Sequence, residues 1–352
     1  MVAKWTPPPV RGTSRLPDID LSRVLLRLLE DPDVASKEGV IRRYDHEVQG
    51  ATVVKPLVGA RHDGPSDAPV LNPWETEGWR GFALGCGVNP YYGQLDPYAM
   101  AWAVVDEALR NVVAVGGDPD RTALLDNFCW GNPSLPDRLG SLVRAAQGCH
   151  DAALAYGTPF VSGKDSLNNE YTDPHGEKQT IPPTLLVSSL SIVSDVRQAV
   201  TMDLKQPGDW LYIVGETRDE LGGSLYSRLY GAGNASVPAP VPDGVDTLRA
   251  VHRAISAGLV RACSEGGLGV AAAEMSIAGR LGVELDLTSL PRSAGVASDV
   301  SALFSESSAR FLVEVHPDDS TAFEEMMAAR PVARLGSVTQ DGMLRVHGSG
   351  GG

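Results

Sequence analysis

The segment PFVSGKDSLNNE, residues 159–170, carries the clearest functional pattern in the 352-residue sequence. Its apolar start has the length of a buried strand and ends at Gly163, and a cation, an acid, a hydroxyl and two amides follow. A glycine at a strand end lets backbone amides approach an anion, and the Lys and Ser that follow suit phosphate oxygens. Asp165 and Glu170 are carboxylates that can bind a divalent cation. The segment indicates either a phosphate site or an ordinary polar turn.

The sequence around this segment alternates predicted strands and helices. Residues 122–125 form a short apolar strand that is followed by Asp126 and Asn127. Open α/β sheets bind ligands beyond the carboxyl ends of their strands, so Asp126 is expected at such an edge. Residues 136–156 have the spacing of a long amphipathic helix, and residues 182–193 read as an apolar strand.

The strongest predicted helix spans residues 97–115. Asp96 suits its N-cap, Pro97 its first position, and Gly116 its end. Glu107 and Asn111 are four residues apart, so their side chains lie on one helix face. An acid and an amide at this spacing indicate either two oxygen ligands for Mg²⁺ or a solvated helix edge.

The length of the chain predicts two domains. We place them at residues 21–197 and 198–346, after a Pro-rich segment, residues 1–20, that we expect to be disordered and before a tail, residues 347–352. Both regions have an α/β pattern, in sheets that need not be parallel. The predicted elements of the second region are helices at 245–263, 268–278 and 319–329 and strands at 210–215, 283–287, 309–315, 332–338 and 343–346.

The composition limits the classes of partner. A formal charge of −14 and a pI of about 4.9 argue against broad nucleic-acid or anionic-membrane binding. The four cysteines lack the spacing of a metal site or a disulfide framework, so we expect small, buried, reduced thiols in a cytoplasmic protein. No apolar run is long enough to span a bilayer, and no signal peptide opens the chain.

Eight ordered motifs together resemble those of phosphoribosylformylglycinamidine synthase, the ATP-dependent amidotransferase of purine synthesis. They are YDHEVQ (44–49), GPSDA (64–68), DPY (96–98), EALRN (107–111), DN (126–127), GKDS (163–166), SEGGL (264–268) and FSES (304–307). The family belongs to the superfamily of aminoimidazole ribonucleotide synthetase, and its synthetase subunit contains two repeats, each with an N-terminal and a C-terminal α/β domain. This chain resembles the second repeat. The resemblance implies that the N-terminal domains of two repeats pair into a closed barrel with helices outside.

The resemblance implies roles for the central segment. Asp126, Gly163 and Lys164 match positions near the nucleotide, and Ser166 matches a substrate contact. Some branches of the family carry a metal-binding Asn where this chain has Lys164, so the metal role is assigned to Asp165.

The resemblance also implies a second nucleotide site. Asp67, Glu107 and Asn111 match its metal ligands, and Ser264 matches a nucleotide contact. The large form of the family has an acid two residues before that serine, but this chain has Ala262, so one metal ligand is missing.

The histidine segment that the family uses for catalysis belongs to the first repeat, so no catalytic residue is assigned here. The first hypothesis is the C-terminal half of the synthetase, which uses ATP and Mg²⁺ to convert formylglycinamide ribonucleotide and ammonia to the amidine. Its partners would be the first repeat and a glutaminase subunit, with a small accessory subunit as a further candidate. One alternative is a non-catalytic nucleotide-binding and assembly module that holds ADP. The other is a homodimeric, ATP-using relative of aminoimidazole ribonucleotide synthetase.

Overall fold

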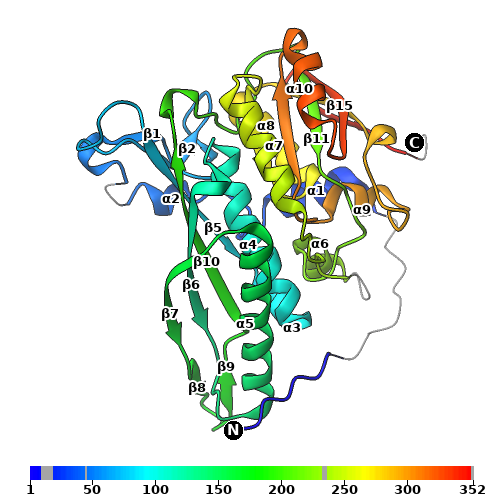
Figure 1. Cartoon of the computed structure of the whole chain (residues 1–352). Helices are drawn as coiled ribbons and strands as arrows, with labels where there is room; N and C mark the ends of the chain where they lie inside the picture. Colours follow the sequence, from blue (N-terminus) through cyan, green and yellow to red (C-terminus); the bar gives the residue numbers. More distant parts are fainter. Residues whose placement is uncertain (9–18, 44–45, 232–235, 350–352) are drawn as a thin grey trace.

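The structure is a computed structural model that describes residues 1–8, 19–43, 46–231 and 236–349. It contains two six-stranded sheets joined by residues 194–209 (Figure 1). The first sheet has helices on one face, and the second has helices on both faces. Tyr44 and Asp45, which open the first of the eight motifs, lie outside the described residues, as do residues 350–352 of the predicted tail. The predicted α/β class is confirmed, with strands that are mainly antiparallel.

The first sheet has the order β1-β4-β5-β10-β6-β7, in which only β6 and β7 run parallel. Its strands are β1 (Thr52–Val54), β4 (Val70–Leu71), β5 (Gly81–Val88), β6 (Thr122–Cys129), β7 (Phe160–Ser166) and β10 (Thr184–Val193). Two short pairs flank it: β2 (Leu57–Val58) with β3 (Gly64–Pro65), and β8 (Glu170–Thr172) with β9 (Lys178–Thr180).

Three helices cover one face of this sheet: α3 (Pro90–Leu95), α4 (Pro97–Ala114) and α5 (Pro136–Tyr156) (Figure 1). The predicted cap of α4 is present, because the Asp96 side chain accepts a hydrogen bond from the Tyr98 amide at 2.9 Å. The opposite face, here called the open face, carries partly exposed apolar side chains. They include Leu84, Val88, Leu125 and Leu190, which are 36–40% exposed. The first sheet is therefore packed on one side only within this chain.

The second sheet has the order β12-β14-β11-β15-β13-β16. Its strands are β11 (Trp210–Val214), β12 (Ala262–Glu265), β13 (Gly282–Asp286), β14 (Phe311–Val315), β15 (Val332–Thr339) and β16 (Leu344–His347). The helices of this region are α6 (Leu225–Tyr230), α7 (Gly244–Ser256), α8 (Leu268–Gly279), α9 (Asp299–Phe304) and α10 (Ser320–Met327). Short 3₁₀ turns lie at Val48–Gly50, Pro119–Arg121, Val196–Gln198, Leu287–Ser289 and Pro317–Asp319.

Several predicted elements have different bounds in the structure. The helix predicted for residues 245–263 ends at Ser256, and Ala262–Glu265 forms strand β12 instead. Gly258 follows that helix with φ +74°, a left-handed conformation that only glycine adopts readily, and it redirects the chain. The polar residues after Gly163 do not form a turn, because they continue strand β7 to Ser166.

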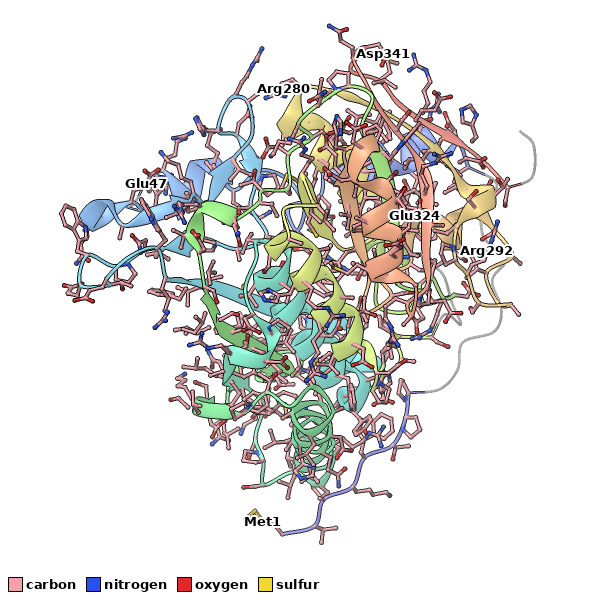
Figure 2. All side chains as sticks on the ribbon, turned by 45° about the horizontal axis from the view of Figure 1, so that its top comes forward. Met1, Glu47, Arg280, Arg292, Glu324 and Asp341 are labelled. Atoms are coloured by element: carbon pink, nitrogen blue, oxygen red, sulfur yellow. The ribbon has the colours of Figure 1, made fainter. Side chains whose placement is uncertain are left out.

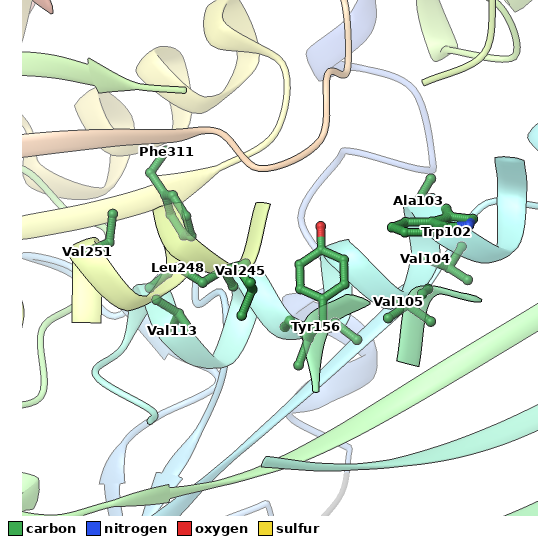
Figure 3. Packing of buried hydrophobic residues seen from close by; sticks show 14 of the residues in the cluster. Trp102, Ala103, Val104, Val105, Val113, Tyr156, Val245, Leu248, Val251 and Phe311 are labelled. Carbon is green, nitrogen blue, oxygen red and sulfur yellow. The ribbon is translucent and has the colours of Figure 1, made fainter. Parts of the chain in front are cut away.

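The two regions share their hydrophobic cores. Helix α1 (Leu21–Leu29), which the sequence assigns to the first region, packs against α6 and α8 of the second. Helix α4 packs against α7, and Figure 3 shows Tyr156 among buried side chains of α4 and α7. The boundary between the predicted domains therefore crosses a continuous apolar contact.

The first residues of the chain lie against helix α5. The Lys4 amide donates a hydrogen bond to the Pro136 carbonyl at 2.8 Å, and the Arg144 guanidinium stacks on Trp5 at 4.3 Å from the ring centroid. Residues 1–8 thus make specific contacts inside a segment whose composition predicts disorder. Met1 lies at the end of the molecule opposite Asp341 (Figure 2).

The labelled charged side chains Glu47, Arg280 and Asp341 lie at the outside of the molecule (Figure 2). Among the described residues, none of the helices has the length and apolar character needed to cross a lipid bilayer.

Candidate functional site: an acidic cavity between the two sheets

A cavity of about 180 Å³ lies where α3 and α4 of the first region meet α6, α8 and α9 of the second. Its polar lining includes Tyr92, Glu107, Arg110, Glu265, Gly267 and Glu306, which come from both regions. Carboxylates dominate this set, so an anionic ligand could enter only together with a cation. We refer to it as the interdomain cavity.

Glu107 is the predicted site residue that faces this cavity. One of its carboxylate oxygens accepts a hydrogen bond from the Val88 amide at 3.0 Å. Burial, opposed by the nearby Arg110 cation, raises the pKa of Glu107 to about 7. Across the cavity, burial also raises the pKa of Glu306, whose carboxylate accepts hydrogen bonds from the Tyr92 hydroxyl and from the Leu225 amide. The cavity is therefore an acidic environment that a bound cation would stabilise.

The amino end of α8 provides the opposite polarity. The helix begins after Gly266, which has φ +110°, and Gly267, whose lack of a side chain leaves the first amides of the helix uncapped. Such a terminus favours anions through its free N–H groups and the helix dipole. Together with Glu107 and Glu306, the turn fits phosphate groups that arrive with a divalent cation.

Arg110 lies one turn beyond Glu107 and is 5% exposed. Its guanidinium pairs with Asp106 on the same helix and with Glu265 at the end of β12. Because both partners of this cation are acids, Arg110 is neutralised by the protein itself.

Asp67 and Ser264 meet beside this cavity. The Ser264 hydroxyl donates to Asp67 Oδ1 at 3.0 Å, whereas Oδ2 is buried and has no hydrogen-bond partner among the described residues. Burial raises the pKa of Asp67 to about 7, and burial together with the Asp67 carboxylate raises that of Glu274 to about 7. A buried carboxylate oxygen without a donor is the kind of atom that a cation would satisfy.

The remaining member of the predicted metal set, Asn111, donates its amide N–H to the Cys86 carbonyl at 2.8 Å, which leaves its oxygen as the possible ligand. Within the described part of the chain, no three His, Cys, Asp or Glu side chains are grouped closely enough to hold a metal ion alone. The donors present fit Mg²⁺ that takes further ligands from phosphate and water.

The structure separates the other predicted residues from this cavity. Asp126 lies within strand β6, not beyond its end, and pairs with Gly163 on the parallel strand β7. A side chain at Gly163 would overlap the Asp126 carboxylate, so the two residues are in close contact. The pKa of Asp126 is raised by burial and by the Asp165 carboxylate.

The pairing of β7 with β6 places alternate residues of the segment 162–166 on opposite faces of the sheet. Lys164 is opposite Asn127, and Ser166 is opposite Cys129, so both point to the open face, while Gly163 and Asp165 point to the helix side. The Lys164 ammonium donates to the Ser166 hydroxyl. Residues 161–165 are exposed along an edge strand, so a ligand there would be shared with whatever covers that edge.

Two of the four cysteines are less buried than the sequence predicts. Cys149 and Cys263 are buried, but Cys86 is exposed on the open face and Cys129 is partly exposed, because alternate residues of β5 and β6 turn away from the helices. Although Cys86 is exposed as a residue, its thiol is partly withdrawn from water. This desolvation, together with the Glu107 carboxylate, raises the pKa of Cys86, which disfavours a nucleophilic thiolate there.

Sequence reasoning assigned no role to Asp106, Arg110, Glu265 or Glu306. One sequence pattern could have indicated a buried ion pair, because Asp106 and Arg110 lie four residues apart in a helix that is otherwise apolar over most of its surface. Charged residues at such positions are buried only when they are paired.

Two family models match the chain. The C-terminal domain of AIR synthase related protein matches residues 206–349, and its N-terminal domain matches residues 66–189. The two matches follow one another and together include the second sheet and most of the first, with β1 and the end of β10 outside them. The chain therefore belongs to the family of AIR synthase related proteins.

Curated relatives point to one branch of that family. The phosphoribosylformylglycinamidine synthase subunit PurL of Thermococcus sibiricus is 36% identical over 301 residues, which are 84% of this chain and 39% of that protein. The PurL subunit of Methanothrix thermoacetophila is 37% identical over 341 residues, 92% of this chain and 42% of that protein. The resemblance to phosphoribosylformylglycinamidine synthase is thus confirmed. The chain spans about two fifths of the length of these relatives.

Solved structures agree on the fold. Thermotoga maritima PurL complexed with ATP has a TM-score of 0.68 at 19% identity, over 93% of this chain and 49% of that one. The same protein complexed with FGAR has a TM-score of 0.65 at 19% identity, over 86% and 48%. The structure of PurLQS from Thermotoga maritima has a TM-score of 0.63 at 18% identity, over 92% and 52%.

Proposed function

We propose that this chain is the second of two repeats of a phosphoribosylformylglycinamidine synthase, that it binds ADP or ATP with Mg²⁺, and that it acts only together with a first repeat. The observation that carries the proposal is the interdomain cavity, which brings Glu107 and Glu306 to the uncapped amino end of α8. Phosphate oxygens suit the helix end, and Mg²⁺ suits the carboxylates.

The cavity is smaller than the roughly 300–1,000 Å³ typical of small-molecule sites. It would therefore receive the phosphate groups, while the nucleoside lies outside it. Glu107, Asp67 and the Asn111 oxygen would hold the cation, and Ser264 would contact the nucleotide. Mg²⁺ would supply neutralisation of the phosphate charge.

The exposed strand β7 supports a shared active site. Lys164 and Ser166 on the open face would contact the phosphates and the ribonucleotide substrate, whereas Asp126, Gly163 and Asp165 would contact the nucleotide or its cation from the helix side of the same edge. Because this edge and the apolar open face are uncovered in the chain, a first repeat would complete the site and close the barrel. In the complete enzyme, ATP would transfer its γ-phosphate to the glycinamide carbonyl oxygen of formylglycinamide ribonucleotide and leave as ADP. Ammonia from a glutaminase partner would then add to that carbon and displace phosphate, which gives the amidine.

A second candidate is a non-catalytic module that holds ADP and supports assembly. Two observations favour it: Ala262 is fully buried in β12 where an acid would complete the metal set, and the described residues contain no group of three potential metal-ligating acids, histidines or cysteines. The two candidates differ in whether the bound nucleotide is consumed.

Reconstitution distinguishes these functions. The chain is mixed with a first repeat, a glutaminase subunit, glutamine, Mg-ATP and formylglycinamide ribonucleotide, and amidine formation is measured. We expect activity only in the complete mixture, and loss of activity when the chain carries Ser166→Ala. Activity of the chain alone would contradict the proposal, whereas activity with unchanged bound ADP would favour the assembly module.

A further inference from the structure

Asp106 on α4 is a buried carboxylate that joins three separate parts of the chain. It is 1% exposed and accepts hydrogen bonds from Arg110 on the same helix and from the Tyr156 hydroxyl, at 2.7 Å, at the end of α5. The Ala309 amide, in the loop before β14, donates to both of its oxygens at 3.1 Å. The proposed nucleotide site uses none of these contacts directly.

One arm of this network reaches the cavity through Arg110. The guanidinium bridges Asp106 and Glu265, which directly precedes the Gly266 and Gly267 turn. All three side chains are largely withdrawn from water, so each charge depends on the next for its neutralisation. Asp106 therefore fixes the position of Arg110, and Arg110 fixes the side chain at the start of the turn.

The other arm reaches the same turn through the backbone. Ala309 has φ +55°, a conformation that costs a residue with a side chain free energy unless its surroundings hold it. Its amide is held there by Asp106, and the next residue, Arg310, donates to the Gly266 carbonyl at 3.0 Å and to the Ser305 carbonyl at 2.6 Å. The turn is thus held from both sides by arginines whose placement depends on Asp106.

We propose that Asp106 is a positioning residue for the interdomain cavity: it sets the Glu265–Gly267 turn against Glu107 and so aligns the amino end of α8 with the cation-binding side. This inference rests on the proposed nucleotide site. Because α4 belongs to the first region and the turn to the second, the same carboxylate couples the docking of the two regions to ligand affinity.

The test is Mg-ADP binding by calorimetry with the whole chain. Asp106→Asn keeps the shape but replaces an acceptor oxygen with a donor amide among three donors, so we expect binding to weaken by about tenfold or more. Tyr156→Phe removes one hydrogen bond and should weaken binding by a smaller factor. If Asp106→Asn does not fold, the Mg-ADP affinity of Tyr156→Phe is compared with that of the wild type instead. Ser191→Ala, which removes a buried hydroxyl from β10, is the control for lost stability and should leave binding unchanged.

A double-variant cycle separates positioning from general destabilisation. If Asp106 acts through Glu265, Asp106→Asn with Glu265→Gln should weaken binding by less than the product of the two single effects. The inference would be overturned if Tyr156→Phe and Asp106→Asn both bound Mg-ADP with wild-type affinity. It would also be overturned if the double variant lost affinity by the product of the two single losses. Either result would leave the nucleotide site intact. Absence of Mg-ADP binding by the wild-type chain would overturn both.

Discussion

The Gly163 Cα lies so close to the Asp126 carboxylate that this position has no room for a side chain. Both residues belong to the region of β6 and β7 that would contact nucleotide. The glycine is therefore explained by close approach of two strands, since its φ does not fall in the left-handed region.

We expect Gly163→Ala to destabilise the chain by about 1–3 kcal/mol, because the new methyl group must displace the Asp126 side chain. Chemical denaturation measures the change. Asp126→Ala should remove most of the penalty when combined with Gly163→Ala. Gly39→Ala is the control, since open space surrounds that helical position. Equal effects at Gly163 and Gly39 would count against the proposed close contact.

Single residues also show the limit of sequence reasoning. Glu107 is recognisable because an acid and an amide four residues apart suggest ligands. Arg110 and Glu265 are distant in sequence, and their pairing depends on how α4 meets the end of β12. No local pattern contains that contact.

At the scale of elements, the amphipathic helices are the most predictable. Helix α5 has the predicted bounds, and α4 ends one residue before the predicted end, because caps and apolar spacing act locally. The sequence pattern places Ala262 and Cys263, the first half of strand β12, in a helix, because short buried strands of small residues resemble helix ends in sequence. Its identity comes from pairing with β14, a long-range contact.

Strand β14 also contains a pH-sensitive contact. Glu314 is fully buried, and its carboxylate accepts hydrogen bonds from the Lys205 amide at 2.9 Å and the Gln206 amide at 3.0 Å, in the segment between the regions. Burial first, and then the neighbouring Asp209 carboxylate, raise the pKa of Glu314 from 4.5 to about 8. The folded chain therefore retains a proton that the unfolded chain releases near pH 4.5.

This stabilisation is complete below about pH 4.5 and is lost as the pH rises through about 8. We expect Glu314→Gln, which cannot ionise, to remove that loss and to be more stable than the wild type at pH 9 by about 1–3 kcal/mol. Unfolding at pH 6 and pH 9 measures the difference. As a control, Glu325→Gln on the exposed side of α10 should show the same pH dependence of the free energy of unfolding as the wild type. The same pH dependence in the wild type, Glu314→Gln and Glu325→Gln would disprove the role of Glu314.

At the scale of the whole molecule, one sheet is covered on one face only. The family match and the motif order predict two α/β domains, and both sheets are present. The sequence does not predict that α1 joins the second region or that the cores merge, because these contacts arise only when the regions pack.

We expect the isolated chain to self-associate at micromolar concentration through the open face and the β7 edge. Light scattering measures the mass. Leu190→Lys places a charge in the middle of the open face and should shift the chain toward monomer with little loss of stability, since the side chain is 37% exposed. Leu154→Lys, on the exposed side of α5, is the matched control. A wild-type chain that remains monomeric at this concentration would argue against the open face as a surface for pairing with a second domain.

A nucleotide bound in the interdomain cavity should stabilise the folded chain, and thermal unfolding with Mg-ADP measures this stabilisation. We predict that Mg-ADP raises the midpoint temperature of unfolding of the wild-type chain and of the control Glu325→Gln, whereas ADP with a chelator does not. Glu107→Gln should remain folded but show no rise in its midpoint temperature with Mg-ADP. Stabilisation of Glu107→Gln equal to that of the wild type would contradict the assignment of the interdomain cavity as the nucleotide site.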